Sequence, residues 1–363
     1  MTDLLALTAE LVDIPSVSHN ERAITDHLEQ LLRGVPWLDV ERVGENVVAR
    51  TALGRPQRLV LAGHTDTVPV NGNERARIDG DVLYGLGSCD MKSGVAVLAE
   101  LARTVAEPTV DVTYVFYECE EVGAQFNGVN RLFAERPDLV AGDVAVLAEP
   151  TGARIEAGCQ GTMRVEVTLN GERAHTARAW LGRNAIHRLG EVLSRVSAYG
   201  ARVVNIDGCE FREGLQAVKV DGGVAGNVVP DNATVWLNHR FAPDRTADEA
   251  EAEVRAVIGD VDGFAVVDLA IPAAPALNHP LLRALVERTG HPPRAKLGWT
   301  DVSRFAEHGI PATNFGPGDP TIAHTRGEHV TRADLEAVHA ALLGLLTDPA
   351  DASASDLRGG ATR

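Results

Sequence analysis

The sequence predicts an α/β protein with a second, smaller α+β domain inserted into it. The chain has 363 residues, which is more than one hydrophobic core normally serves, so two domains are expected. Strand-like and helix-like segments alternate in the first 160 residues and again after residue 272, as in a mostly parallel sheet with helices on both faces. Between these stretches the pattern changes to half-exposed strands around two amphipathic helices.

The elements of the first stretch follow from hydrophobic spacing. Residues 1–15 have the pattern of an amphipathic helix, with Thr2 as a candidate N-cap. The apolar runs that follow predict buried strands at residues 58–62, 110–117 and 143–148, and a helix at residues 92–104. Since strands and helix alternate, the strands should pair in parallel.

The inserted stretch has a different texture. Alternation from Met163 to Leu169 predicts a strand with one buried face, and apolar spacing from Ile186 to Val196 predicts a helix. The later elements are strands near 215–220 and 233–241, a helix that begins with the capping box Thr246 and Glu249, and a strand at 264–269. The order β-α-β-β-α-β is that of a ferredoxin-like unit.

These patterns place the insertion inside one discontinuous domain. We expect residues 1–160 and 273–347 to form the α/β domain and residues 161–272 to form the ferredoxin-like domain. The α/β domain should end with a helix at about residues 332–346. Residues 348–363 are rich in small and polar side chains, so we expect a mobile tail.

The composition excludes several classes of partner. The formal net charge is −17, and an acidic chain repels both nucleic-acid phosphates and anionic lipid. No apolar run approaches the length of about 20 residues that a membrane span needs, and the first residues carry acids where a signal peptide carries bases. Four cysteines without a CxxC pair are typical of buried thiols in a reducing compartment. We therefore expect a cytoplasmic protein with neither a nucleic-acid nor a membrane partner.

Acids and a histidine follow three of the predicted strands. His64 and Asp66 follow the first strand, Glu120 and Glu121 the second, and Glu149 the third. Ligand sites in open α/β sheets lie beyond the carboxyl ends of the strands, so these side chains should meet in space. Each alone has an ordinary alternative, such as a satisfied core histidine or a solvated strand end.

Asp90 lies in a glycine-rich loop, GLGSCDMKSG, just before the predicted helix at 92–104. The loop is not a dinucleotide-binding fingerprint, because GxGxxG would need glycine at position 90. Taken alone, Asp90 would be a helix N-cap. Beside His64, Glu121 and Glu149 it indicates a metal site, because carboxylates crowded in a partly buried site need cations to stay ionised.

Imidazole and carboxylate groups suit a pair of zinc-like ions, although cobalt or manganese could occupy the same ligands. Asp66 follows His64 by two residues and is placed to accept the second N–H of that imidazole. Adjacent residues of an extended strand point to opposite sides. If the strand continues, only one of Glu120 and Glu121 should therefore bind metal, and the other is free to act as a base.

Five separated motifs are similar to those of one enzyme family. They are HTDTVP at 64–69, the GLGSCDMKSG loop, ECEEVG at 118–123, AEPT at 148–151 and the late segment IAHTRGEHV. In this order they closely resemble the zinc-dependent amidohydrolase family that includes succinyl-diaminopimelate desuccinylases, acetylornithine deacetylases, aminoacylases and glutamate-type carboxypeptidases. The resemblance covers nearly the whole chain, and it is nearest to the desuccinylases.

The resemblance implies a role for each residue of the site. Two zinc ions would be held by His64 and Glu149 on one side and by Glu121 and His324 on the other, with Asp90 bridging. Glu120 would be the general base, and Asp66 would be a catalytic residue beside His64. The family pattern also implies a cis peptide bond between Asp90 and Met91.

For the inserted domain the resemblance implies a lid that also forms a homodimer. His175 would reach the partner subunit's active site and stabilise the oxyanion, while Asn227 and Arg240 would contact substrate. Asn227 could instead be a turn residue, and Arg240 an ordinary surface base. The chain departs from the desuccinylases at HTARAW, where those enzymes commonly carry a tyrosine-proline pair. Arg178 in this segment could pair with a substrate carboxylate or lie on the lid surface.

The implied activity is hydrolysis of the amide bond in a small anionic N-acylated amino acid. The nearest likeness implies removal of succinate from N-succinyl-LL-2,6-diaminopimelate. An acetylornithine-type deacetylase and a metallo-dipeptidase or carboxypeptidase stay open, because the metal motifs are common to the family. A metal-binding scaffold without catalysis is the non-enzymatic alternative, and the presence of the base Glu120 disfavours it.

Overall fold

The computed structural model describes residues 3–348. The candidate cap Thr2 lies outside the described residues, and so do residues 349–363 of the tail predicted at 348–363. Its first residue, Asp348, is the C-cap of the last helix, Arg332–Thr347. The chain divides into two compact units. The first unit comprises Met1–Ala157, Pro275–Arg294 and Asp301–Arg363, and the second comprises Gly158–Ala274 and Ala295–Thr300.

An eight-stranded sheet forms the centre of the first unit. In spatial order its strands are β1 (Asp39–Val43), β2 (Asn46–Arg50), β6 (Asp111–Tyr117), β3 (Arg58–His64), β7 (Val144–Leu147), β16 (Ala312–Asn314), β8 (Glu156–Ala157) and β15 (Arg294–Ala295). The four strands β6, β3, β7 and β16 pair in parallel. The pairs β1 with β2, β2 with β6 and β8 with β16 are antiparallel. The prediction of a mostly parallel sheet is therefore confirmed.

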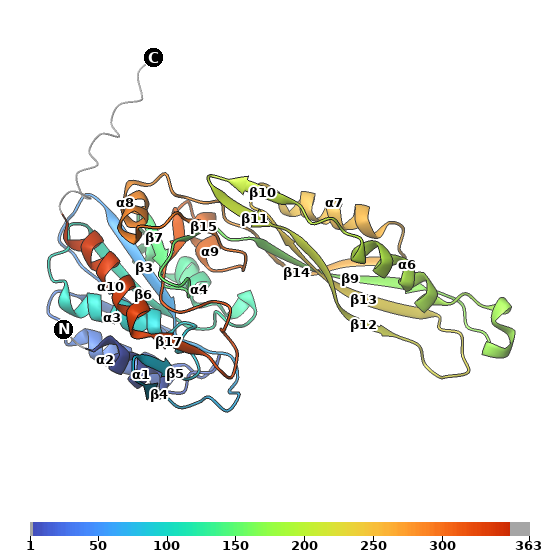
Figure 1. The fold of residues 1–363 in the computed structure, drawn as a ribbon, viewed down its shortest axis with the longest axis horizontal. Helices are drawn as coiled ribbons and strands as arrows, with labels where there is room; N and C mark the ends of the chain where they lie inside the picture. Colours follow the sequence, from blue (N-terminus) through green and yellow to red (C-terminus); the bar gives the residue numbers. More distant parts are fainter. Residues whose placement is uncertain (1–2, 349–363) are drawn as a thin grey trace, which may run out of the picture. The chain divides into compact units, whose positions relative to one another are not determined.

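Helices cover both faces of this sheet, as predicted. They are α1 (Leu4–Val12), α2 (Arg22–Arg33), α3 (Lys92–Thr104), α4 (Gly128–Glu135), α5 (Pro137–Val140), α8 (Pro280–Thr289), α9 (Val302–Glu307) and α10 (Arg332–Thr347). In Figure 1, α3 and α10 lie on one side of the strands, and α4 and α9 lie on the other. Helix α3 is buried from Lys92 to Ala102, which explains its strongly apolar sequence. The side chain of Asp3 caps α1 by accepting a hydrogen bond from the Leu5 N–H.

A small three-stranded sheet joins distant parts of the first unit. It consists of β4 (Arg77–Asp79), β5 (Val82–Tyr84) and β17 (His329–Thr331), and β17 pairs antiparallel with β5. A short 3-10 helix, η1 (Ala124–Phe126), precedes α4. The pairing of β17 brings the chain that follows His324 back to the N-terminal half of the unit.

The second unit is ferredoxin-like, as predicted. Its elements are β9 (Gly161–Asn170), η2 (Thr176–Leu181), α6 (Ala185–Ser197), β10 (Val203–Ile206), β11 (Cys209–Arg212), β12 (Gly214–Gly222), β13 (Asn232–Phe241), α7 (Ala247–Ile258) and β14 (Gly263–Ala270). The antiparallel sheet has the order β12-β13-β9-β14. Alternate residues of β9, such as Val165 and Val167, share one buried core with Leu189 of α6 and Val254 of α7. The added hairpin β10-β11 was not predicted.

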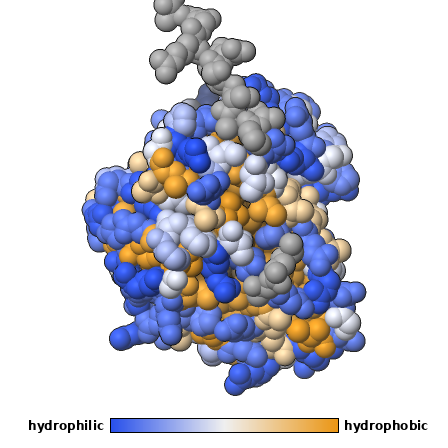
Figure 2. Space-filling view, turned by 90° about the vertical axis from the view of Figure 1, so that its left-hand side faces the viewer, coloured by the Kyte–Doolittle hydropathy of each residue, from blue (hydrophilic) through white to orange (hydrophobic). Residues whose placement is uncertain are grey.

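The face of the molecule drawn in Figure 2 mixes hydrophilic and hydrophobic residues. Figure 2 shows a face on which hydrophobic residues appear in separate patches between hydrophilic ones. Among the described residues, no helix is both long and apolar enough to cross a membrane. All four cysteines of the sequence are free thiols and are buried, as expected.

Candidate metal centre

The parallel strands β3, β6 and β7 end at the same edge of the large sheet. His64 is the last residue of β3, Glu120 and Glu121 follow the end of β6, and Glu149 follows the end of β7. The sheet therefore gathers at one edge four side chains that are up to 85 positions apart in sequence. His64 and Glu149 are buried, while Glu120 and Glu121 are half-buried.

The gathered side chains form three overlapping groups of candidate metal ligands. The groups are His64 with Glu120 and Glu121, His64 with Asp90 and Glu149, and Asp90 with Glu121 and His324. Within each group one nitrogen or oxygen atom of every residue lies within 4.8 Å of the others. Asp90 belongs to two of the groups, so its two carboxylate oxygens could serve two neighbouring ions.

Asp90 lies between the two histidines. Its Oδ1 is 3.1 Å from His64 Nε2, and its Oδ2 is 3.4 Å from His324 Nε2. The Asp90–Met91 peptide bond is cis, as the resemblance implied. The backbone N–H groups of Cys89 and Asp90 both donate to Glu328 Oε1 at 3.0 Å. Glu328 is buried, so this carboxylate fixes the loop that carries Asp90.

Asp66 contacts the other nitrogen of the His64 ring. His64 Nδ1 is 3.4 Å from Asp66 Oδ1 and 3.1 Å from the Asp66 backbone oxygen. Asp66 also accepts the backbone N–H groups of Glu120 at 3.0 Å and Glu121 at 3.1 Å. Burial opposes its ionisation, but the hydrogen bond with His64 and the Glu120 N–H hold the pKa of Asp66 below its usual value.

Glu120 and Glu121 do not continue the strand. Strand β6 ends at Tyr117, and Cys119 has a φ of 58°, in the left-handed region. The backbone therefore turns before the two glutamates. As a result, one carboxylate oxygen of each lies within 4.8 Å of a ring nitrogen of His64. The expectation that neighbouring glutamates point to opposite sides applies to an extended strand, and it fails here because the strand has already ended.

The electrostatics of the site favour a bound cation. Burial raises the pKa of Glu120 well above its usual value, and the nearby carboxylate of Glu149 raises it further. The hydrogen bonds to Asp90 and Glu121 raise the pKa of His324 to about 10. Two histidines thus face five carboxylates, those of Asp66, Asp90, Glu120, Glu121 and Glu149. Divalent cations balance such a surplus of negative charge.

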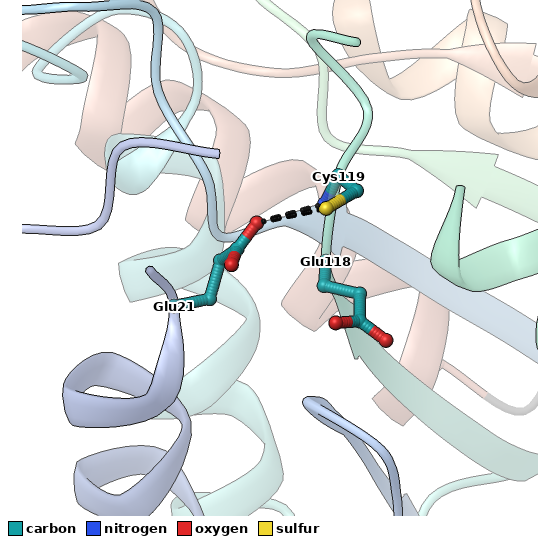
Figure 3. Close-up of side chains that lie close together, drawn as sticks. All are labelled: Glu21, Glu118 and Cys119. Carbon is teal, nitrogen blue, oxygen red and sulfur yellow. Dashed lines mark hydrogen bonds between the residues drawn. The ribbon is translucent and has the colours of Figure 1, made fainter. Parts of the chain in front are cut away.

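A fourth group, Glu21 with Glu118 and Cys119, has similar residue types but different surroundings. Figure 3 shows that Glu21 points toward Cys119, whereas the carboxylate of Glu118 points away from Glu21. Glu118 forms an ion pair with Arg131 and accepts a hydrogen bond from the Asn46 side chain at 3.3 Å. Burial raises the pKa of the Cys119 thiol to about 12. A neutral thiol and an already paired carboxylate are poor metal ligands.

The other predicted site residues belong to the second unit. His175 accepts the Ala177 N–H through Nδ1 at 3.0 Å, and it forms an isolated β-bridge with Val228. The Thr176 N–H donates to the Asn227 backbone oxygen at 3.0 Å, so the segments of His175 and Asn227 lie side by side. Arg178 is exposed within η2, and Arg240 is half-buried on β13.

The residues that hold the ligand loops were not predicted from the sequence. Glu328 fixes the Asp90 loop, as described above, and Ser18 donates its hydroxyl to Asp66 Oδ2 at 2.8 Å. Glu21 contacts Cys119 beside the two glutamates. Ser18 and Glu21 lie in the polar connection between α1 and α2, and such a segment carries no hydrophobic period that would identify it. The motif IAHTRGEHV contained Glu328, but its pattern singled out only His324.

Comparison with known proteins agrees with this geometry. Residues 60–348 match the model of the peptidase family M20/M25/M40. A Mycobacterium tuberculosis protein named "Putative succinyl-diaminopimelate desuccinylase DapE" is 53% identical over 337 residues, covering 92% of this chain and 95% of that protein. The succinyl-diaminopimelate desuccinylase of Corynebacterium glutamicum is 46% identical over 357 residues, covering 95% and 96%.

Solved structures share the fold across nearly the whole chain. A tripeptidase from Staphylococcus aureus has a TM-score of 0.77 at 19% identity, covering 96% of this chain and 98% of that one. A dinuclear metal binding peptidase of the M20 family from Bacillus subtilis has a TM-score of 0.66 at 16% identity, covering 94% and 96%. The resemblance predicted from the motifs is confirmed, and the chain belongs to the peptidase family M20/M25/M40, a family of metal-dependent hydrolases.

Proposed function

We propose that the chain is a dinuclear-metal amide hydrolase that removes succinate from N-succinyl-LL-2,6-diaminopimelate to give LL-diaminopimelate. The observation that carries the proposal is the position of Asp90 between His64 and His324, within reach of Glu121 and Glu149. The named desuccinylases, 53% and 46% identical over most of their length, support this substrate.

The residues of the site fit a pair of divalent ions. His64 and Glu149 would hold one ion, Glu121 and His324 the other, and Asp90 would bridge them. The group of His64, Asp90 and Glu149 and the group of Asp90, Glu121 and His324 have only Asp90 in common, which supports this arrangement. We propose zinc, because imidazole and carboxylate are ligands that it accepts readily, with cobalt and manganese as the alternatives. When bound, such ions lower the pKa of water and stabilise negative charge on a carbonyl oxygen.

Glu120 would move the proton during the reaction. Its carboxylate lies in one group with His64 and Glu121 and is not needed as a ligand in the proposed set. It would accept a proton from the attacking water as the oxygen adds to the amide carbon. It would then pass that proton to the nitrogen as the carbon–nitrogen bond breaks, releasing succinate and a free amine. Asp66 would keep the His64 ring in one orientation.

The second unit would supply the contacts that select the substrate. We propose that His175 stabilises the oxyanion in the partner subunit's site, which requires a homodimer formed by the lid. Asn227, Arg240 and Arg178 would contact a small anionic N-acylated amino acid, since guanidinium groups pair well with carboxylates. The adjacency of the His175 and Asn227 segments supports a shared role for these two.

Comparative kinetics test the proposed substrate. The zinc-loaded protein should hydrolyse N-succinyl-LL-2,6-diaminopimelate with a kcat/KM at least about 100-fold above that for acetylornithine or simple dipeptides, because polar groups built for one substrate are left unpaired by another. A dipeptide that is cleaved as efficiently would overturn the assignment.

Metal removal is the matched control for that experiment. Dialysis against a chelator should abolish turnover, and added zinc should restore it. Activity that survives complete removal of metal, measured by elemental analysis of the same sample, would contradict the dinuclear mechanism.

A further inference from the structure

Glu21 is a buried carboxylate that the proposed reaction does not use. It lies at the start of α2 and is 1% exposed. Its Oε1 accepts three hydrogen bonds, from the His19 N–H at 3.0 Å, the Cys119 N–H at 3.2 Å and the Cys119 thiol at 3.2 Å. Figure 3 shows the contact between Glu21 and Cys119. A buried carboxylate costs free energy unless it is well paired, so this contact calls for an explanation.

Three consecutive backbone N–H groups, those of Cys119, Glu120 and Glu121, donate hydrogen bonds to buried carboxylates. The first of them donates to Glu21. The next two, from Glu120 and Glu121, go to Asp66 Oδ1 and Oδ2. Asp66 is in turn held by the hydroxyl of Ser18, three residues before Glu21. The segment between α1 and α2 therefore holds the whole turn, directly through Glu21 and indirectly through Ser18 and Asp66.

The turn needs such support because of its backbone conformation. Cys119 has a φ of 58°, in the left-handed region that is unfavourable for a residue with a Cβ atom. Without a partner for its N–H, the residue would relax toward negative φ. That relaxation would rotate the following peptide units, which carry Glu120 and Glu121.

Metal binding does not explain the Glu21 contact. Arg131 and Asn46 satisfy the nearby carboxylate of Glu118, and its side chain points away from Glu21. The Glu21 oxygen that faces Cys119 is already occupied by three donors. Glu21, Glu118 and Cys119 therefore all have partners within the chain, without a metal ion.

We propose that Glu21 is a positioning residue of the hydrolase, which accepts the Cys119 N–H and so holds Glu120 and Glu121 toward the metal-binding groups. The inference rests on the proposed function, because it assigns Glu120 as base and Glu121 as ligand. Glu21 belongs to none of the three candidate ligand groups that contain His64 or His324, so it would act only through the turn.

Two variants at position 21 test the proposal. Glu21→Ala removes the acceptor, and it should lower kcat by about 10 to 100-fold with little change in KM. The same variant should weaken binding of zinc alone, measured by isothermal titration calorimetry, by about 10 to 100-fold. Glu21→Gln keeps an amide oxygen for the Cys119 N–H, so it should recover most of both properties.

Asp111→Asn is the matched control for loss of stability. Asp111 is also a buried carboxylate that accepts backbone N–H groups, from Leu53 at 2.8 Å and Arg55 at 2.9 Å. It begins β6, at the opposite end of the strand from Glu120. This variant should lower the thermal midpoint while keeping kcat and the zinc affinity.

The outcomes separate the alternatives. A folded Glu21→Ala protein with wild-type kcat and zinc affinity would overturn the proposal, and so would equal losses of kcat in Asp111→Asn. Loss of one bound ion per chain, with the remaining ions bound normally, would identify Glu21 as a metal ligand instead. Zinc titration needs no substrate, so a wrong substrate assignment would leave this arm of the test intact.

Discussion

At the scale of the residue, two glutamates of one turn differ completely in their surroundings. Glu120 lies in one group with His64 and Glu121, whereas Glu118 pairs with Arg131. Glu120→Gln should lower kcat by about 100 to 10,000-fold, since it removes the proposed general base, and it should keep both metal ions. Glu118→Gln is the matched control and should keep kcat. Steady-state kinetics with elemental analysis check both, and normal turnover by Glu120→Gln would refute the base assignment.

The Asp111 carboxylate makes stability depend on pH. Burial alone would raise its pKa, but the Leu53 N–H and Thr51 hydroxyl hold the pKa below the unfolded value of 3.8. Its stabilising effect is therefore complete above about pH 3.8 and is lost as pH falls through the lower folded pKa. Asp111→Asn should cost about 1 to 3 kcal/mol at pH 7.

Denaturant unfolding of both proteins from pH 7 to pH 3 measures this difference. The gap between wild type and Asp111→Asn should narrow only at the acid end of the series. A gap that is constant with pH would show that the charge of Asp111 contributes nothing.

The residues at strand ends were predictable because their location follows from topology. His64, Glu121 and Glu149 could be brought together from sequence, since the ends of parallel strands share one edge. The supporting carboxylates Glu21 and Glu328 could not, because each acts by accepting backbone N–H groups of a remote loop. Such a contact leaves no pattern in either segment.

At the scale of the element, α3 approaches the end of β7 closely at Gly94. A Cβ atom there would collide with the carbonyl oxygen of Ala148 and lie 2.9 Å from the Ala148 Cβ. Gly94→Ala should therefore destabilise the first unit by about 1 to 3 kcal/mol. It should also lower zinc affinity, because Ala148 directly precedes Glu149. Thermal unfolding and zinc titration measure the two effects.

Gly190 in α6 provides the opposite case. No atom lies within 4 Å of a Cβ built at this exposed helical position. Gly190→Ala should stabilise the protein by about 0.5 to 1 kcal/mol, because alanine favours the helix. If Gly94→Ala raised the thermal midpoint as Gly190→Ala should, the packing argument for Gly94 would fail.

Long elements with one strong pattern were predicted well, and short ones were not. Helix α3 occupies the predicted residues, Lys92–Thr104, because its apolar side chains are buried almost throughout. Strands β4 and β16 have only three residues each. All three residues of β4 are exposed, so no alternation marks it. Tertiary pairing, rather than local sequence, makes these segments strands.

At the scale of the whole molecule, the proposed homodimer makes each site depend on two chains. Glu120→Gln and His175→Ala subunits should each be nearly inactive as homodimers, the second because an oxyanion donor is worth about 100 to 1,000-fold in rate. Mixed dimers should contain one intact site each. A dimer that contains one subunit of each variant should therefore have about half of wild-type activity.

Co-expression of the two variants with different affinity tags, followed by purification through both, tests this prediction. Light scattering of the wild-type protein should give the mass of a dimer. Mixed dimers that stay inactive would show that His175 does not act across subunits.

The discontinuous organisation has a consequence for the order of events during synthesis. His64, Asp90 and Glu149 leave the ribosome well before His324, which follows Glu149 by 175 positions. At about 5 to 20 residues per second this delay is roughly 9 to 35 s. The insertion is translated in that interval, so it can fold while the ligand group around His324 is still incomplete. The two ions would then be loaded one after the other, with the His324 position last.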